Sequence, residues 1–303
     1  MYDIIIVGAG TAGLSAAIYS LRAGKSVLVL EQQPSYGGQI VNASKVENYP
    51  GIPEISGFEF AKSLYEQAVG LGAEVIFQKV IRIEEQAPNK VVCTEKDSWE
   101  CKSIILATGA KKRPLGVPGE ETFAGKGVSY CATCDGMFFR GKEVAVAGGG
   151  NTALEDANFL ANYCSKVTVI HRRDTFRGDK KSLMRLQAKQ NVTFLLDSEV
   201  VELLGENMLS GIKVRNKKNG KVTEVPVSGL FIAVGQMPDS EVFSDQVETD
   251  QLGYIVANED CKTNKEGIFV AGDCRTKTVR QLTTAASDGA IAGIAACEWC
   301  DGK

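Results

Sequence analysis

The chain has 303 residues, of which 44% are hydrophobic and 23% charged, a composition typical of a globular protein with room for two domains. Its formal net charge of −3 makes neither nucleic acid nor an anionic membrane an expected partner. The nine cysteines are odd in number and mostly scattered, which argues against a secreted disulfide framework. The first residues contain no basic leader with a small-residue cleavage site, so we expect no secretory signal and predict a cytoplasmic protein.

The first 31 residues predict a strand, a helix and a second strand. Asp3–Val7 is a β-branched run, Thr11–Gly24 has apolar residues at helical spacing, and Val27–Leu30 is again a short apolar run. The turn between the first strand and the helix is rich in glycine and has the sequence Gly8-Ala-Gly10-Thr-Ala-Gly13. This order predicts a βαβ nucleotide-binding unit.

Each glycine of this turn has a physical reason in such a unit. Gly8 permits the tight turn, Gly10 lets a pyrophosphate approach the backbone, and Gly13 allows close helix packing. The N-terminus of the helix then faces the phosphates. Glu31, at the end of the second strand, is expected to accept a hydrogen bond from a ribose hydroxyl.

The same pattern returns in the middle of the chain. Glu143–Ala147 and Val167–Ile170 are predicted strands, and Thr152–Tyr163 is a predicted helix. The glycine-rich turn of this repeat is Gly148-Gly-Gly150-Asn151-Thr152-Ala153. Further apolar strands that close on glycine are predicted at Ile104–Gly109, Gly229–Gly235 and Gly267–Asp273. The chain is therefore expected to be an α/β protein with two Rossmann-like nucleotide-binding domains.

The two repeats differ where the ribose is read. At the place of Glu31 the second repeat has His171, followed by Arg172 and Arg173, with Arg177 one turn on. Arginines grip a 2′-phosphate bidentately, whereas a carboxylate would repel it, so the second repeat favours NADP over NAD. A solvated basic helix face is the plain alternative for such a charge run. Since the first repeat keeps its acid, its nucleotide should have a free ribose diol, which fits FAD.

The domain order is expected to be discontinuous. Lys111–Gly119 and Gly235–Ser240 are polar, proline-bearing segments that we predict to be linkers. The simplest division places residues 1–112 and 243–303 in an FAD domain, with an NADPH domain at 113–242 inserted into it.

The sequence Cys131-Ala-Thr-Cys134-Asp135 lies just ahead of the second turn. A C-x-x-C pair can be half of a zinc site, and the only other close pair is Cys297 and Cys300 near the end of the chain. Redox use of Cys131 and Cys134 is the stronger interpretation, with no metal, and a helix N-terminus there would stabilise a thiolate. Asp135 is expected to be an acid–base group, a helix N-cap, or both. For Cys297 and Cys300 we prefer small buried residues on a last helix over a second redox relay.

These motifs in this order resemble the low-molecular-weight thioredoxin reductases over essentially the whole chain. The resemblance also draws on Gly37-Gly38-Gln39, Val46-Glu-Asn48-Tyr-Pro-Gly51, Ala107-Thr108-Gly109 and Gly272-Asp273. It implies FAD at Gly8, Gly10, Gly13, Glu31, Gly38, Gln39, Asn48, Thr108, Gly109, Gly272, Asp273, Arg280, Gln281 and Leu282. It implies NADPH at Gly150, Asn151, Thr152, Ala153, His171, Arg172, Arg173 and Arg177.

The resemblance also implies a mechanism and partners. Electrons would pass from NADPH through FAD to a disulfide of Cys131 and Cys134, and from there to the disulfide of thioredoxin. Cys134 would be the thiol nearest the flavin, Cys131 would attack the substrate disulfide, and Asp135 would be the acid–base group. The inserted domain would rotate on its two linkers, and the protein would be a homodimer.

Two other interpretations stay open at the level of sequence. One is a related flavoprotein that uses reduced ferredoxin as donor, or a peroxiredoxin or a low-molecular-weight disulfide as acceptor. Arg172 and Arg173 argue for NADPH, but nothing in the chain identifies the acceptor. The other is a non-catalytic nucleotide sensor, against which Cys131, Cys134 and Asp135 argue. The larger glutathione-reductase type, with its C-x4-C and C-terminal histidine, fits less well.

Overall fold

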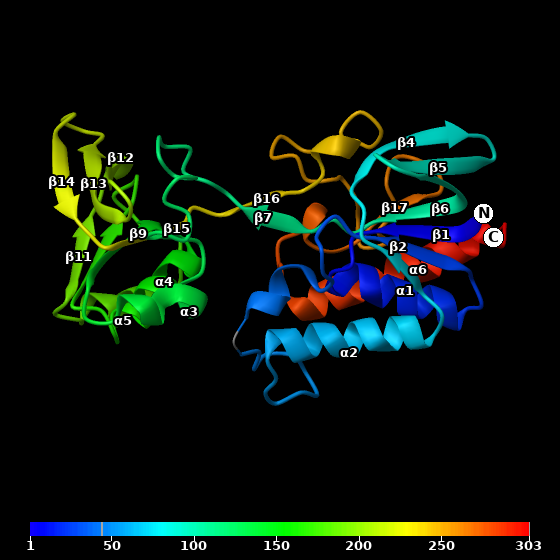
Figure 1. The fold of residues 1–303 in the computed structure, drawn as a ribbon, viewed down its shortest axis with the longest axis horizontal. Coiled ribbons are helices and arrows are strands. Elements are labelled where there is room, and N and C mark those ends of the chain that lie inside the picture. Colours follow the sequence, from blue (N-terminus) through cyan, green and yellow to red (C-terminus); the bar gives the residue numbers. More distant parts are fainter. Residues whose placement is uncertain (44, 303) are drawn as a thin grey trace. The chain divides into compact units, whose positions relative to one another are not determined.

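The computed structural model describes residues 1–43 and 45–302, and the side chain of Cys134 lies outside that description. The chain forms two compact units, one made of residues 1–111 and 237–303 and the other of residues 112–236 (Figure 1). Parallel sheets with helices occur in both units, which confirms the predicted α/β class. Residues 237–242, which the sequence suggested for the inserted segment, belong to the first unit.

The first unit is built on a seven-stranded sheet. Its main path is β3-β2-β1-β6-β5-β4, and β17 pairs with β6 on a separate branch. Pairing is parallel among β1, β2, β3, β6 and β17, and antiparallel where β5 joins β6 and β4. The strands are β1 (Tyr2–Val7), β2 (Val27–Leu30), β3 (Glu74–Ile76), β4 (Val80–Gln86), β5 (Asn89–Thr94), β6 (Ser98–Leu106) and β17 (Ile268–Val270).

Successive residues of β1 enter two separate cores because side chains alternate across a strand. Ile4 and Ile6 pack with the helical layer, whereas Ile5 and Val7 pack on the other face. The helices of this unit are α1 (Thr11–Arg22), α2 (Gly57–Gly70) and α6 (Leu282–Cys300), with short 3₁₀ turns η1 (Gly38–Asn42), η3 (Glu241–Phe243) and η4 (Gly272–Cys274). Helix α6 lies directly against α1, since a Cβ on Gly289 would come within 2.2 Å of the Ala12 carbonyl oxygen.

The second unit has a five-stranded parallel sheet in the order β11-β10-β9-β15-β8. The same unit also contains a three-stranded antiparallel sheet in the order β12-β13-β14. The strands are β8 (Val128–Ser129), β9 (Glu143–Gly148), β10 (Lys166–Ile170), β11 (Val192–Leu195), β12 (Ser198–Gly205), β13 (Leu209–Asn216), β14 (Val222–Pro226) and β15 (Gly229–Ala233). The helical segments are α3 (Ala132–Asp135), η2 (Gly136–Phe139), α4 (Asn151–Leu160) and α5 (Lys180–Gln187).

Two short paired strands connect the units: β7 (Ala110–Lys112) and β16 (Gln236–Pro238). Asp239 follows β16 and belongs to the first unit, where its backbone N–H donates to the Gly109 carbonyl oxygen at 3.1 Å and its carboxylate accepts from Gln32 at 2.6 Å. Among the described residues, no helix has both the length and the apolar character needed to cross a membrane.

The predicted elements occur with small shifts in their ends. Helix α1 ends at Arg22 because Gly24, the predicted last residue, has a φ of +79° and turns the chain out of the helix. Helix α4 begins at Asn151 and ends at Leu160, three residues before the predicted Tyr163.

Candidate nucleotide turns and redox site

The first glycine-rich turn is sterically specified by its backbone neighbours. Gly8 has a φ of +111°, and a Cβ there would lie 2.3 Å from the Ala107 carbonyl oxygen. A Cβ on Gly13 would lie 1.9 Å from the Gly8 carbonyl oxygen, so α1 can approach this closely only without a side chain. Around Gly10, by contrast, nothing lies within 4 Å of a Cβ position. The turn therefore presents open backbone at Gly10, ahead of the N-terminus of α1, as a pyrophosphate requires.

Glu31 directly follows β2 and is hydrogen-bonded to this turn. One carboxylate oxygen accepts the Ala9 backbone N–H at 2.7 Å, and the other accepts the Gln33 backbone N–H at 2.8 Å. The residue is only 6% exposed. Since each carboxylate oxygen has more than one lone pair, Glu31 keeps acceptor capacity beside the turn.

Residues 37–48 form hydrogen bonds with three other segments of the first unit, one of which is the first glycine-rich turn. The Gly37 backbone N–H donates to the Ala9 carbonyl oxygen at 2.8 Å, and the Gln39 side chain donates to the Ala110 carbonyl oxygen. Asn48 Nδ2 donates to Gln281 Oε1 at 3.1 Å, although the two residues are 233 positions apart in the sequence. Gln281 is the N-cap of α6, which begins at Leu282.

Asp273 supplies a buried acceptor to which no described residue donates a hydrogen bond. It follows β17 in the turn η4, and its Oδ1 atom is buried with no hydrogen-bond partner among the described residues. Burial raises the pKa of this carboxyl, opposed by Lys277 and Arg280. Buried polar atoms are generally satisfied by a hydrogen bond, so this oxygen is a candidate acceptor for a donor group of a bound molecule. The hydroxyl groups of the sugar chain of FAD are such donors, so Asp273 fits this cofactor.

Asp288 of α6 holds the backbone next to Asp273. Its Oδ2 accepts the Gly272 backbone N–H at 2.9 Å, and the carboxylate receives Arg275 bidentately, with both bonds at 2.8 Å. Lys277 Nζ donates to the same Oδ2 at 2.8 Å. Sequence reasoning missed this buried group because no local motif connects Asp288 with Gly272.

The second glycine-rich turn repeats the geometry of the first. A Cβ on Gly148 would lie 2.2 Å from the Ala233 carbonyl oxygen, just as Gly8 meets that of Ala107. Gly150, like Gly10, has nothing within 4 Å of its Cβ position. Ala153 takes the place of the third glycine, at the start of α4. This turn too presents open backbone ahead of a helix N-terminus.

The imidazole ring of His171 packs against the backbone of the second glycine-rich turn. A Cβ on Gly149 would come within 2.2 Å of the imidazole ring, so the ring packs directly on the glycine backbone. His171 Nε2 lies 3.0 Å from the Thr175 carbonyl oxygen, and the ring stacks on Phe176. Burial lowers the pKa of His171, and the charges of the neighbouring arginines lower it further. The histidine is therefore a neutral packing residue at neutral pH.

The arginine loop folds back onto the same turn. The Arg177 backbone N–H donates to the Gly149 carbonyl oxygen at 2.9 Å, and the Asp179 backbone N–H donates to Asn151 Oδ1 at 2.7 Å. Arg172, Arg173 and Arg177 are exposed, and within the part of the chain that the structure describes they form no ion pair. Their guanidinium groups are therefore available to an anionic ligand.

Cys131 lies two residues after the end of β8, and it is disulfide-bonded and half-buried. The side chain of Cys134, the predicted partner, lies outside the described residues. Thr133 Oγ1 lies 3.4 Å from Cys131 Sγ, and the Asp135 backbone N–H donates to the Cys131 carbonyl oxygen at 3.1 Å. Helix α3 is a single turn, so it offers far less helix dipole than the sequence suggested.

Asp135 is held by a residue that the sequence reasoning missed. Ser129 Oγ donates to Asp135 Oδ2 at 2.6 Å and accepts the Cys131 backbone N–H at 3.1 Å. The expectation of an N-cap was wrong for the side chain: Asp135 is the N-cap residue of η2, but its carboxylate makes no capping hydrogen bond. The carboxylate is instead turned toward the hydroxyl of Ser129.

The second cysteine pair does not belong to a nucleotide turn. Cys300 Sγ donates to the Asp3 carbonyl oxygen at 3.4 Å, at the N-terminal end of β1. Gly8 follows the other end of that strand, about 17 Å away at about 3.3 Å per residue. Burial raises the pKa of Cys300 to about 11 and also raises that of Cys297. Both are free thiols, and no group of three or more potential metal ligands occurs among the described residues.

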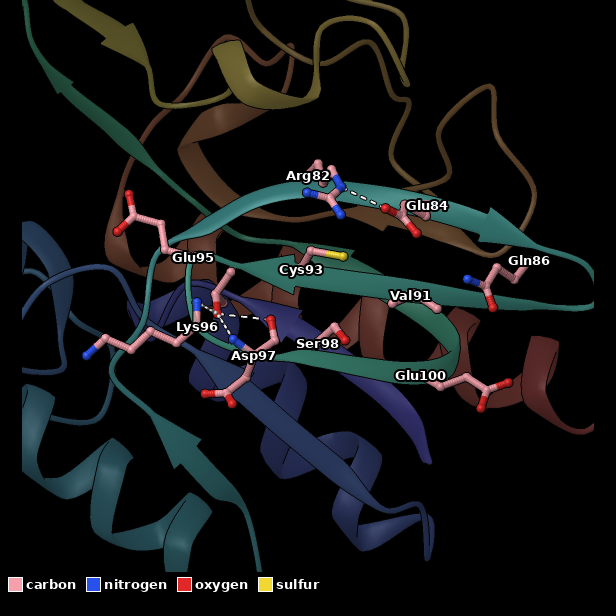
Figure 2. Close-up of a pocket in the computed structure, with 11 residues that line it drawn as sticks. Arg82, Glu84, Gln86, Val91, Cys93, Glu95, Lys96, Asp97, Ser98 and Glu100 are labelled. Carbon is pink, nitrogen blue, oxygen red and sulfur yellow. Dashed lines mark hydrogen bonds and ion pairs between the residues drawn. The ribbon is translucent and has the colours of Figure 1, made fainter.

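An open hollow of about 780 Å³ lies over β4, β5 and the turn that follows β5 (Figure 2). Charged side chains of both signs line it, including Arg82, Glu84, Glu95 and Lys96. Arg82 Nε and Glu84 Oε1 form an ion pair at 2.7 Å across its rim. These strands form the antiparallel part of the sheet, so the hollow is separate from the glycine-rich turns.

Comparison with known proteins places the chain in a family. A family model described as "Pyridine nucleotide-disulphide oxidoreductase" matches residues 2–289. The thioredoxin reductase of Treponema pallidum is 42% identical over 301 residues, covering 99% of this chain and 97% of the relative. That of Peptoclostridium acidaminophilum is 41% identical over 303 residues, covering 98% of this chain and 96% of the relative. The solved thioredoxin reductase of Lactococcus lactis is 41% identical, with a TM-score of 0.91 and complete coverage of both chains.

The chain therefore belongs to the pyridine nucleotide-disulphide oxidoreductases and, within them, to the low-molecular-weight thioredoxin reductases. It is an oxidoreductase of a flavoprotein family whose cofactors are FAD and NADPH.

Proposed function

We propose that this protein transfers electrons from NADPH through FAD to a disulfide of Cys131 and Cys134, and from there to the disulfide of thioredoxin. One observation carries the proposal: two glycine-rich turns of the same geometry have different partners, a carboxylate at Glu31 and a group of unpaired arginines after His171. The disulfide of Cys131 lies in the same unit as the arginines. The flavin, when bound, supplies the two-electron relay between the nicotinamide and the disulfide.

We assign FAD to the first unit. The open backbone at Gly10, the acceptor capacity of Glu31 and the unpartnered Oδ1 of Asp273 support this assignment. By family resemblance we assign the following further residues to FAD: Gly8, Gly13, Gly38, Gln39, Asn48, Thr108, Gly109, Gly272, Arg280, Gln281 and Leu282.

We assign NADPH to the second unit. Gly150 provides open backbone for the pyrophosphate, and Asn151, Thr152 and Ala153 begin α4 behind it. We choose NADPH over NADH because of Arg172, Arg173 and Arg177. A guanidinium group binds a phosphate bidentately, and only NADPH has a 2′-phosphate.

The chemistry at the dithiol follows from thiol–disulfide exchange. In the reduced enzyme the Cys131 thiolate attacks the substrate disulfide, which forms a mixed disulfide and releases one substrate thiolate. Cys134 then attacks Cys131 Sγ, so that the enzyme disulfide re-forms and the second substrate thiolate leaves. Asp135 holds and delivers the proton that a leaving thiolate needs. The Ser129 hydroxyl, which also binds the Cys131 backbone N–H, keeps the carboxylate of Asp135 in place.

The surface beside the dithiol supports a protein as acceptor. Met137 and Phe138 follow Asp135 closely in the sequence and are 47% and 74% exposed. Large apolar side chains at this exposure favour contact with a partner protein over a small polar disulfide. The names of the relatives identify thioredoxin as the candidate of this kind.

The remaining parts of the proposal concern assembly and motion. By family resemblance, we infer a cytoplasmic homodimer whose second unit rotates on the β7 and β16 linkers between hydride transfer and exchange with thioredoxin. Size-exclusion chromatography with light scattering tests the dimer, and a monomer at micromolar concentration would contradict it.

The deciding experiment follows the flavin absorbance of purified yellow protein in a stopped-flow instrument. NADPH should bleach it at least about tenfold faster than NADH at equal concentration, and oxidised thioredoxin should restore the colour. Bleaching by reduced ferredoxin alone would replace the donor, and recovery only with a peroxiredoxin or a low-molecular-weight disulfide would replace the acceptor. Cys131→Ser protein should still bleach but fail to reduce thioredoxin; wild-type turnover of that variant would overturn the role of Cys131.

A further inference from the structure

Tyr130, the residue before Cys131, is held at both of its polar ends. Lys112 Nζ donates to the Tyr130 carbonyl oxygen at 2.6 Å. The Tyr130 hydroxyl donates to Glu120 Oε1. The first bond comes from the residue that begins the second unit, at the end of the linker strand β7.

Glu120 connects Tyr130 with the segment that follows the linker. It is 5% exposed, and its two oxygens accept the backbone N–H groups of Leu115 at 3.0 Å and of Gly116 at 2.8 Å. Gly116 has a φ of +74°, which lets the two amides point at one carboxylate. Burial and the hydrogen bond to Glu120 raise the pKa of Tyr130, so its hydroxyl remains a donor over the whole physiological range.

The other side of Cys131 is held independently. Ser129 binds the Cys131 backbone N–H and the carboxylate of Asp135. Cys131 is thus fixed from within its own turn by Ser129 and from the linker segment through Tyr130. These are separate sets of hydrogen bonds, and only the second one reaches the linker.

We propose that Lys112, Glu120 and Tyr130 are positioning residues for Cys131, which tie the linker segment to the entry of the dithiol turn. The proposal rests on the redox role proposed for Cys131. Thiol–disulfide exchange requires the attacking sulfur to approach along the axis of the disulfide, and small displacements of a reacting group slow a reaction strongly. Release of the Tyr130 hydroxyl should therefore slow exchange at Cys131 without affecting the arginine turn.

The test uses Tyr130→Phe in the FAD-loaded full-length enzyme, with Tyr163→Phe of the same unit as the matched control. The exchange step is measured by mixing the pre-reduced enzyme with oxidised thioredoxin, and separately with the small disulfide 5,5′-dithiobis(2-nitrobenzoate). We expect both exchange rates to fall about tenfold in Tyr130→Phe, while the rate of flavin reduction by NADPH and the KM for NADPH stay at wild-type values. Tyr163→Phe should leave all of these values unchanged.

A double-mutant cycle with Glu120→Gln separates positioning from a general loss of stability. If Glu120 acts through Tyr130, the double variant should be no slower than the slower single variant. Multiplying effects, unchanged exchange in Tyr130→Phe, or an equal fall in flavin reduction would each overturn the proposal. Should Glu120→Gln not fold, Glu120→Asp, which keeps the charge but shortens the side chain that receives the Tyr130 hydroxyl, takes its place in the cycle. Failure of the redox assignment itself would be seen separately, as wild-type turnover of Cys131→Ser.

Discussion

Glu31 and His171 occupy the same place in the two repeats, and each contacts the middle residue of its own glycine-rich turn. Glu31 accepts the backbone N–H of Ala9 at 2.7 Å, whereas the ring of His171 packs on Gly149 with no room for a Cβ. The turn of the first repeat is thus held by a hydrogen bond, and the turn of the second repeat is held by packing against an aromatic ring. His171 is followed by the exposed Arg172 and Arg173, the side chains to which we assign the 2′-phosphate of NADPH.

This contact predicts that Gly149→Ala specifically impairs nucleotide binding in the second unit. The added Cβ would come within 2.2 Å of the His171 ring and force the ring and the arginine loop apart. The KM for NADPH should rise at least about tenfold, while the bound flavin content of the purified protein stays complete. Gly70→Ala, where a Cβ meets nothing within 4 Å, is the control. Loss of flavin together with NADPH binding would contradict the assignment.

Replacing both Arg172 and Arg173 by alanine should remove the preference for NADPH. Each guanidinium–phosphate contact contributes about 1.5–3 kcal/mol as a charged hydrogen bond, so loss of both should raise the KM for NADPH by at least about two orders of magnitude. The KM for NADH should change by less than about threefold, since NADH has no 2′-phosphate. Arg215→Ala, which removes an exposed ion pair with Glu199 in the same unit, is the matched control. Equal losses for both nucleotides would argue that the loop has only a structural role.

Asp288→Asn should destabilise the first unit in a way that depends on pH. Burial opposes ionisation, but the hydrogen bonds from Arg275 and Lys277 prevail and lower the pKa of Asp288. A depressed carboxyl pKa stabilises the fold above the unfolded value near 4, and this contribution is lost as pH falls through the folded value. The variant should lose about 3 kcal/mol of unfolding free energy at pH 7, because two buried cations lose their partner.

The measurement is urea unfolding between pH 3 and pH 8. The gap between wild type and Asp288→Asn should shrink below about pH 4, where the wild-type carboxyl also becomes protonated. Glu66→Gln, in an exposed pair with Lys62, should change stability by less than about 0.5 kcal/mol. A gap that stays constant down to pH 3 would show that charge is not the cause.

Asp156→Asn should increase the free energy of unfolding, whereas Asp288→Asn should decrease it. Burial raises the pKa of Asp156 to about 6, and the opposing charge of Lys112 does not compensate. A carboxyl whose pKa is raised on folding favours the protonated state, so it costs stability as pH rises from about 4 to about 6. The asparagine variant should be more stable than wild type by about 2 kcal/mol at pH 7 and equally stable near pH 4. Thermal unfolding at the two pH values, with Glu206→Gln as an exposed control, decides this.

Cys300→Ser should leave turnover with thioredoxin within about twofold of wild type. The Cys300 thiol lies at the N-terminal end of β1, far from the turn at Gly8, and its raised pKa keeps it protonated at neutral pH. Steady-state kinetics, with Cys131→Ser as the inactive reference, give the comparison. A loss of tenfold or more would instead indicate a second redox relay at the end of α6.

The sequence predicted those parts of the fold that local patterns encode. The strand Val27–Leu30 was predicted with its observed ends, because glycine and charged residues bound a short apolar run. The spacing from Gly8 to Glu31 equals the spacing from Gly148 to His171, and this equality alone identifies Glu31 and His171 as equivalent positions of the two repeats.

What the sequence did not predict depends on contacts between distant residues. Nothing local indicates that Asn48 meets Gln281, or that Glu120 receives the hydroxyl of Tyr130. The predicted N-cap hydrogen bond of Asp135 does not form. The Asp135 carboxylate instead accepts a hydrogen bond from the hydroxyl of Ser129, six residues earlier, and α3 is only a single turn. Such choices among competing partners are settled only when the chain is packed.

The close packing of α6 on α1 sets an order for biosynthesis. The first glycine-rich turn and α1 precede the second unit in the chain, whereas α6, whose Gly289 packs directly on Ala12 of α1, follows that unit. The unit of residues 112–236 is formed by one continuous segment, whereas the first unit is formed by two. During synthesis the arginine turn and the dithiol segment therefore emerge before α6, and the packing of α6 on α1 can form only after the second unit has been made.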